Sequence, residues 1–167
     1  AMAVEPSELI RLRRLPEKAV MDDEGIFAIV DASRLAHVGV ILDGVPLVLP
    51  TLVLRQGRTL LLHGSRSSRL LRAMLEADRI CVTITVVDGL VVARSAFESS
   101  VAYRSAVLFG RAERIEDEAE KLAALDALTD GVIPGRTAEL RRPTASELRR
   151  TTVLRFTIEE ASGKAGG

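Results

Sequence analysis

Residues 60–71, LLLHGSRSSRLL, contain an abrupt change of pattern. The apolar run that opens this stretch ends at His63 and Gly64, and leucines resume at helical spacing from Leu70. This change of period indicates a strand that gives way to a helix. Between the two lie three serines and two arginines at residues 65–69, which we call the serine–arginine loop.

A helix that begins near Ser67 turns free backbone N–H groups, and about half a positive charge, toward this loop. The serine hydroxyls are neutral donors, and the guanidinium groups of Arg66 and Arg69 are forked cationic donors. Together these groups suit a phosphate. Serine is also an ordinary N-cap residue and arginine an ordinary surface residue, so a plain capped helix stays open from these residues alone.

On both sides of this stretch the sequence has the pattern of consecutive strands. Strands are expected at residues 36–42, 45–54, 58–63, 79–87, 90–97, 103–115 and 151–160. Two Asp-Gly pairs, at residues 43–44 and 88–89, are hairpin signals, because glycine adopts a positive φ at little cost. Pro46 and Pro50 cannot donate to a ladder, so they indicate an edge strand or a bulge.

Helices are expected after Asp22, over residues 67–76, over residues 117–130 and after Thr144. The last two begin with the spacing of a capping box. In each of the first three, a set of residues shares one helix face: Ile26, Ile29, Val30 and Ser33, then Leu70, Leu71, Met74 and Leu75, and then Ala119, Leu122, Ala123 and Leu125. Many strands with short glycine turns favour a closed or nearly closed antiparallel barrel with the helices packed outside it.

The composition disfavours several classes of function. Lysine plus arginine and aspartate plus glutamate both number 23, and aromatic residues make up 3%, which argues against a nucleic-acid partner. Cys81 is the single cysteine, and no metal-binding spacing occurs, so we expect no disulfide and no metal site. No apolar run approaches the roughly 20 residues of a membrane span, and no signal peptide is recognisable. We therefore expect a cytoplasmic protein with no membrane partner.

From about Leu12 to Lys164 the chain resembles the FMN-binding split-barrel superfamily of the pyridoxamine 5′-phosphate oxidases. Within it, the resemblance is to the branch of 5-nitroimidazole reductases. The segments that carry it are LRRLPEK (12–18), VPLVLPTLV (45–53), LLLHGSRSSRLLRAM (60–74), ICVTITVVDGLVVARSAF (80–97), SSVAYRSAVLFGRAERI (99–115), IPGR (133–136) and RRTTVLRFTIEEASGK (149–164).

The resemblance implies a mainly β fold, a six- to seven-stranded antiparallel split β-barrel with peripheral helices. We expect an N-terminal arm over residues 1–20, the FMN-binding domain over residues 21–160 and a flexible tail over residues 161–167. The resemblance also implies a homodimer with a flavin at each side of the interface.

The resemblance implies FMN as cofactor and assigns residues to it. The isoalloxazine ring would lie along Leu49, Pro50, Thr51, Leu52 and Val53. The ribityl phosphate would be held by His63, Gly64, Ser65, Ser67, Ser68 and Arg69. Contacts from the second subunit would come from Arg94, Ser95, Tyr103 and Arg104. Lys164 is a candidate for a cofactor or partner contact, and solvent exposure is the alternative.

The resemblance places His63 beside the flavin, where its imidazole is a candidate catalytic proton donor, since the reference pKa of roughly 6.5 lies near working pH. The alternative is that His63 only positions the cofactor or caps the turn. The leading hypothesis is an oxidoreductase in which FMN takes hydride from a nicotinamide cofactor and reduces a small acceptor such as a nitroaromatic. Two alternatives are a non-catalytic module that binds flavin, deazaflavin or haem, and an oxidase of pyridoxamine phosphate. The chain contains no GxGxxG motif, so the nicotinamide would stack transiently on the flavin.

Overall fold

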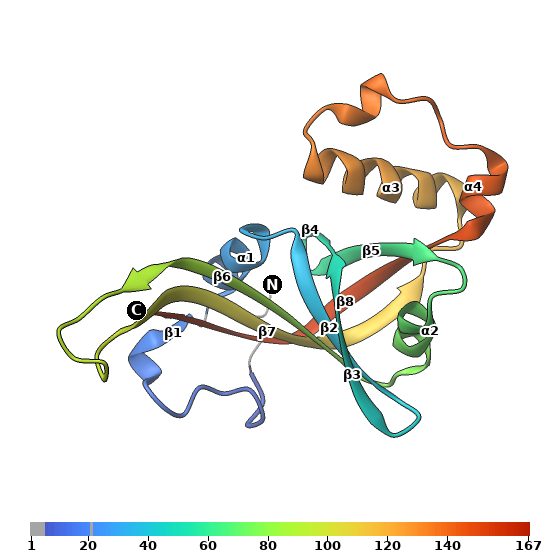
Figure 1. Ribbon diagram of the computed structural model, residues 1–167. Helices are drawn as coiled ribbons and strands as arrows, with labels where there is room; N and C mark the ends of the chain where they lie inside the picture. The colour runs from blue at the N-terminus through green and yellow to red at the C-terminus, as the bar shows by residue number, and fades with distance from the viewer. Residues whose placement is uncertain (1–5, 21) are drawn as a thin grey trace.

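The computed structural model describes residues 6–20 and 22–167, so residues 1–5 of the expected arm and residue 21 lie outside the described residues. The described strands form one antiparallel sheet in the order β3-β2-β6-β7-β8-β5-β4, with β1 paired to β8 (Figure 1). The strands are β1 (Ala19–Val20), β2 (Leu35–Leu42), β3 (Val45–Leu52), β4 (Leu54–Gln56), β5 (Thr59–Ser65), β6 (Ile80–Val91), β7 (Ser100–Arg114) and β8 (Thr151–Gly166). The helices are α1 (Asp23–Asp31), α2 (Arg69–Glu76), α3 (Glu118–Val132) and α4 (Ala145–Arg150), with 3₁₀ turns at Pro16–Lys18 and Arg136–Glu139. The predicted fold class, a mainly β split barrel with peripheral helices, is confirmed, with eight strands in the described sheet where six to seven were expected.

The barrel is split at Val53. The hydrogen-bonded path of the sheet ends at β3 on one side and at β4 on the other, so the barrel is not closed. These two strands follow each other in the chain, separated only by Val53, whose side chain is 1% exposed. The Val53 N–H donates to the Arg34 carbonyl at 2.9 Å instead of to a neighbouring strand. The predicted single strand over residues 45–54 is therefore two strands with a break at a buried residue.

Of the two predicted Asp-Gly hairpins, the one at residues 43–44 is confirmed and the one at residues 88–89 is wrong. Asp43 and Gly44 have φ values of 52° and 77°, as a tight turn between β2 and β3 requires. Gly89 has no positive φ, and β6 continues through it to Val91. The pairing with β7 shifts between Val87 and Gly89, so Asp88 is the extra residue of a β-bulge. The expected strand over residues 90–97 is thus the end of β6 followed by the loop to β7.

Two apolar clusters lie on opposite faces of the sheet. The main core fills the barrel interior, where alternate strand residues such as Leu60, Leu62, Leu154 and Phe156 pack with α1 and α2. The second cluster lies on the other face of β5 and β8, which we call the outer face, beneath α3. Its buried members are Leu61, Ile115, Ala124, Leu128 and Val153. The outer face is thus a second surface of the sheet, and α3 can form one side of a binding site there.

The helix predictions are confirmed in position and corrected in detail. Asp22, Ser68, Asp117 and Thr144 each cap a helix by accepting a backbone N–H. The Thr144–Glu147 capping box is complete, whereas Glu120 bonds Arg155 instead of closing the box with Asp117. Ser33 lies beyond the end of α1 at Asp31. The buried face of α3 is centred on Ala124 and Leu128, not on the predicted set of Ala119, Leu122, Ala123 and Leu125.

The expected C-terminal tail, residues 161–167, is largely part of the sheet. β8 runs to Gly166 and pairs with β7 throughout this segment, and Gly163 and Lys164 also pair with β1. The glycines that suggested fraying allow close packing, since a Cβ at Gly163 would lie 2.9 Å from Cβ of Val20. Among the described residues, no helix is long and apolar enough to cross a bilayer.

Candidate functional site

Strand β3 has a free edge. It pairs with β2 along its whole length, from Leu35 opposite Leu52 to Leu42 opposite Val45, and it ends the hydrogen-bonded path of the sheet. Backbone N–H and C=O groups that point away from β2 therefore have no strand partner among the described residues. Pro46 and Pro50 are tolerated here for the same reason, as the edge-strand prediction required. The predicted ring-binding residues 49–52 lie on this edge, and Val53 follows it at the break.

The serine–arginine loop folds back on itself before α2. The Ser65 hydroxyl lies 2.9 Å from that of Ser67 and accepts the Ser67 N–H at 3.2 Å. The Ser68 N–H donates to the Ser65 carbonyl at 2.9 Å, and the Ser68 hydroxyl caps α2 by accepting from Leu71 N–H at 3.3 Å. Arg66 N–H donates to the Arg150 carbonyl at 2.8 Å, which fixes the loop to the end of α4. Ser68 is thus a structural cap, while the hydroxyls of Ser65 and Ser67 lie at the surface.

Several donors of this loop are unused within the described part of the chain. The N–H groups of Arg69 and Leu70 open α2 and have no acceptor one turn back. The side chains of Arg66 and Arg69 are exposed, and neither forms a hydrogen bond or ion pair with a described residue. Amide donors at a helix N-terminus, together with two guanidinium groups, match the donor set that a phosphate requires.

His63 lies at an apolar crevice between β5 and α3. The crevice has a volume of about 130 Å³ and is lined by His63, Leu52 and, from α3, Leu125, Leu128, Thr129 and Val132. His63 is exposed by its surface area, but the protein atoms packed around the crevice partly desolvate its imidazole. This burial lowers the pKa of His63 below its usual value of 6.5. The imidazole is therefore mainly neutral near pH 7.

The structure brings the two predicted halves of the flavin site together on the outer face. His63 and Ser65 are two residues apart on β5, so their side chains project from the same face of the sheet. Leu52, from the predicted ring-binding strand, lines the crevice of His63. Gly64 lies between them, and a Cβ there would come within 2.9 Å of Leu71 Cδ1.

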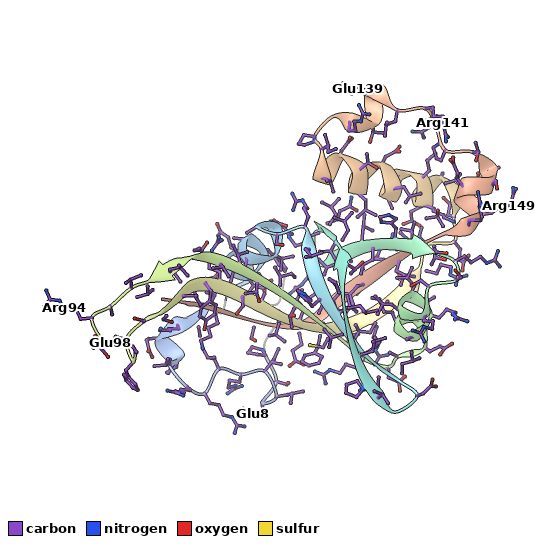
Figure 2. The ribbon with its side chains drawn as sticks, in the orientation of Figure 1. Glu8, Arg94, Glu98, Glu139, Arg141 and Arg149 are labelled. Atoms are coloured by element: carbon purple, nitrogen blue, oxygen red, sulfur yellow. The ribbon has the colours of Figure 1, made fainter. Side chains whose placement is uncertain are left out.

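The remaining predicted residues lie at the other end of the molecule. Arg94 is on the loop beyond β6, at the opposite end from Arg149 of α4 (Figure 2). Ser95 shares that loop, where its hydroxyl accepts the N–H of Phe97 at 3.1 Å. Within one chain, neither these two residues nor Tyr103, Arg104 and Lys164 line the His63 crevice. The sequence-based hypothesis assigned four of these five residues, all except Lys164, to contacts from a second subunit.

Three of these distant residues already contact one another or a neighbour. Arg104 is engaged by Asp88, with donor–acceptor distances of 2.7 and 2.8 Å, and this pair lowers the pKa of the carboxyl. Lys164 Nζ lies 5.7 Å from the centre of the Tyr103 ring, which is a cation–π contact. Arg104 therefore has a structural partner that the sequence alone did not reveal.

The α3 residues that wall the crevice were missed by sequence reasoning. Leu125 was placed on the helix face, but Leu128 and Val132 were not. Apolar residues occur on most sides of this helix, so no single stripe marks the face that packs on the sheet. Arg114 and Arg149, which lie near the serine–arginine loop, were also missed, because their charge clusters read as solvated surface.

Comparison with known proteins places this geometry in a family. The family model described as pyridoxamine 5′-phosphate oxidase matches residues 22–165. Among curated proteins, none matches this sequence. The flavocytochrome Anf3 from Azotobacter vinelandii is 42% identical over 98% of this chain and 76% of its own, with a TM-score of 0.90. The FAD and haem binding protein from Mycobacterium smegmatis is 45% identical over 89% of this chain and 73% of its own, with a TM-score of 0.83.

A more distant structure shares the fold. A provisionally assigned 5-nitroimidazole antibiotic resistance protein from Bacteroides thetaiotaomicron is 23% identical over 88% of this chain and 86% of its own, with a TM-score of 0.74. The two flavin- and haem-binding proteins are thus more similar to this chain than that protein is. The matched model spans nearly all of the described fold, and the chain belongs to the pyridoxamine 5′-phosphate oxidase family.

Proposed function

We propose that this protein is a flavin-dependent oxidoreductase that holds a flavin mononucleotide group, as FMN or as part of a larger flavin, on the outer face of the split barrel. The observation that carries the proposal is the set of unused phosphate donors in the serine–arginine loop. The free edge of β3 supports it, because unpaired backbone groups suit the polar edge of an isoalloxazine ring. When bound, the flavin supplies the transfer of hydride and electrons.

The finer proposal concerns the substrates. A nicotinamide cofactor would deliver hydride, and a small acceptor such as a nitroaromatic would receive the electrons. The exposed position of the β3 edge leaves room for a second planar molecule to stack there. We also propose a homodimer with a flavin at each side of the interface, in which Arg94, Ser95, Tyr103 and Arg104 reach the partner's flavin.

The role of His63 depends on its protonation state. A proton donor to a reduced acceptor must carry the proton near working pH, but burial lowers the pKa of this imidazole. A neutral imidazole in an apolar crevice instead suits a metal ligand. This favours a second candidate function, an electron-transfer protein that binds both a flavin and a haem, in which His63 would be a ligand of the haem iron. The two relatives at 42% and 45% identity, a flavocytochrome and a FAD and haem binding protein, support this candidate.

The test is a visible spectrum of the purified protein together with identification of the released cofactor. Flavin absorbance that bleaches with NADPH and returns on adding a nitroimidazole supports the oxidoreductase proposal. A Soret band that is lost in His63→Ala, with flavin retained, supports the flavin and haem candidate. A protein that binds no flavin when incubated with FMN, FAD or riboflavin contradicts both.

If His63 is the proton donor, His63→Ala keeps the flavin but slows reoxidation by a nitroimidazole about 100-fold. Reduction of the flavin by NADPH changes much less, since that hydride transfer needs no acid from His63. Single-turnover reoxidation and flavin content, measured on the same sample, separate this role from cofactor positioning. A variant that loses flavin while activity per bound flavin stays normal contradicts the proton-donor role.

A further inference from the structure

A cluster of arginine side chains lies where the serine–arginine loop, α2 and the end of α4 come together. Its members are Arg66 of the loop, Arg69 and Arg72 of α2, and Arg149 and Arg150 of α4, and we call them the arginine patch. All of these residues are exposed, and no side chain among them forms a hydrogen bond or an ion pair with a residue that the structure describes. The fold therefore leaves this set of cationic groups uncompensated.

Backbone contacts hold the members of the arginine patch near one another. The Arg66 N–H donates to the Arg150 carbonyl at 2.8 Å, and Arg66 and Arg149 line the same cavity of about 170 Å³. Arg69 and Arg72 are three residues apart on α2, so their side chains leave the same side of that helix. Arg149 lies at the edge of the molecule (Figure 2). Like charges gathered in this way repel one another, and an acidic partner relieves that repulsion.

Two carboxylates beside the arginine patch are engaged by other groups. Glu147 of α4 accepts hydrogen bonds from the Arg141 guanidinium at 2.7 and 2.9 Å and from the Thr144 N–H at 2.8 Å. Glu116 lines the cavity of Arg66 and Arg149 but lies 3.8 Å from Arg114. The positive charge of the patch is therefore local, in a chain whose basic and acidic residues are equal in number.

A single phosphate group would use only part of the arginine patch. In the proposed flavin site, Arg69 and the amide groups at the start of α2 hold the phosphate. Arg72 of α2 and Arg149 and Arg150 of α4 remain, and they project from two different helices. Contact with all three requires the surface of a macromolecule.

The surroundings of the patch favour an acidic protein over a nucleic acid. The exposed carboxylates Glu76, at the end of α2, and Glu116 border the patch and would repel a continuous phosphate backbone. The patch also contains no aromatic side chain on which a base could stack. A protein surface that carries both signs of charge, with acidic residues in excess, can complement the patch and its border together.

We propose that the arginine patch docks a small acidic electron-carrier protein, a source of electrons for the bound flavin besides the nicotinamide cofactor. This rests on the proposed function, since the patch shares Arg66 and Arg69 with the loop that holds the flavin phosphate, and a carrier docked there lies beside the flavin. Two carrier molecules are each oxidised by one electron, and these two electrons, with two protons from solvent, reduce one bound flavin.

The experiment mixes flavin-loaded protein with a purified acidic ferredoxin, reduced beforehand, in a stopped-flow instrument. The rate constant of flavin reduction should fall at least about tenfold between about 20 mM and about 300 mM salt, because screening weakens the attraction between the two proteins. Arg72→Glu and Arg149→Glu should each lower the rate constant at low salt about tenfold and flatten its salt dependence, because charge reversal at a docking surface acts on association. Flavin content should stay unchanged in both variants.

Arg14→Glu is the matched control and should keep the wild-type rate constant. Arg14 is also exposed and has no side-chain partner in the described part of the chain. It belongs to the N-terminal segment of Glu8, which lies away from Arg149 and α4 (Figure 2). Photochemical reduction, which needs no docked protein, checks that every variant contains a reducible flavin.

Three results overturn the inference while flavin binding persists. The first is a rate constant that does not depend on salt, and the second is equal slowing in Arg14→Glu and Arg72→Glu. The third is tighter binding of a duplex oligonucleotide than of the ferredoxin at the same salt concentration, lost in Arg72→Glu, which assigns the patch to nucleic acid. A protein that binds no flavin contradicts the proposed function instead, and calorimetric titration with the ferredoxin then tests the docking surface by itself.

Discussion

At the scale of single residues, the site depends on which polar groups the fold leaves without a partner. The Ser68 hydroxyl caps α2 by accepting a backbone N–H. Arg66 and Arg69, in contrast, have exposed guanidinium groups with no acceptor in the described chain. Both histidines of the chain are exposed, but they differ in their surroundings, because His63 lines the apolar crevice and His37 lies on β2.

Arg69→Ala should weaken FMN binding by about 1.5–3 kcal/mol, the usual size of a hydrogen bond to a charged group. Riboflavin lacks the phosphate, so its affinity should hardly change. Fluorescence titration of both ligands measures the difference, with Arg72→Ala as the control on the same helix. If riboflavin and FMN lose affinity equally, Arg69 does not contact the phosphate.

Protonation of His63 should destabilise the fold at acid pH. Burial lowers the pKa of His63 in the folded chain, so the unfolded chain binds this proton at higher pH than the folded chain does. The stabilisation is therefore complete above the unfolded value of about 6.5 and decreases as the pH falls through it toward the folded value.

Urea unfolding of the cofactor-free protein at several pH values tests this dependence. The free energy of unfolding should fall less between about pH 7.5 and pH 5.5 in His63→Gln than in the wild type. Identical slopes in the wild type and His63→Gln would show that His63 is not shielded from water.

At the scale of elements, two β-bulges interrupt the pairing of the long strands β6, β7 and β8. The β7–β8 pairing shifts between Phe109 and Gly110, and the β6–β7 pairing shifts at Asp88. A Cβ at Gly110 would lie 1.8 Å from the carbonyl oxygen of Thr157, which is backbone and cannot rotate away. A Cβ at Gly89 would have no heavy atom within 4 Å.

Gly110→Ala should therefore destabilise the protein by about 1–3 kcal/mol or more, because β8 must shift to admit the methyl group. Gly89→Ala should be close to neutral, since the added methyl group has room and φ is not positive there. Chemical denaturation of both variants gives the comparison. Similar unfolding free energies for the two variants would contradict the close strand packing at Gly110.

The capping box of α4 should make stability sensitive to acid. Hydrogen bonds from Arg141 and from the Thr144 backbone lower the pKa of Glu147 to about 2. The contribution of the Glu147 carboxylate is present above its ordinary pKa of about 4.5 and is lost as the pH falls toward the folded value. Glu147→Gln should reduce the loss of stability between about pH 5 and pH 2, as measured by thermal unfolding, and an unchanged pH profile would exclude this contribution.

At the scale of the whole molecule, one outer surface of the sheet is apolar and open to solvent. A groove of about 350 Å³ there includes Ile41 and Val48, which are 65% and 61% exposed, together with Cys81 and Phe109. An apolar surface of this kind favours association.

We expect a homodimer whose interface exceeds about 2,000 Å², as in obligate dimers. Val48→Lys should shift the protein toward monomer in sedimentation at micromolar concentration, because it places a charge in the groove. Leu140→Lys, on the loop between α3 and α4, should leave the dimer intact. A wild type that sediments as a monomer and still retains flavin would contradict the expectation.

The local elements of this protein follow from its amino-acid sequence, because their signals are local. The hydrophobic periodicity, the helix caps and the Asp43-Gly44 turn each depend on residues a few positions apart. The helix starts at Asp22, Asp117 and Thr144 were therefore predictable. The resemblance carried by segments across the chain added the split-barrel fold, which the family match confirms. The clustering of donors in the serine–arginine loop is likewise a property of five consecutive residues, so the sequence alone contains it.

Tertiary packing decided the structure of the segments for which a local sequence signal allows more than one conformation. Asp88-Gly89 reads as a turn, but pairing with β7 and the ion pair with Arg104 keep β6 extended through it. The apparent tail became strand because β7 and β1 supply partners that lie far away in sequence. The lowered pKa of His63 likewise depends on α3 packing beside β5. Burial and convergence of charge are properties of residues distant in the chain, and only the folded arrangement brings them together.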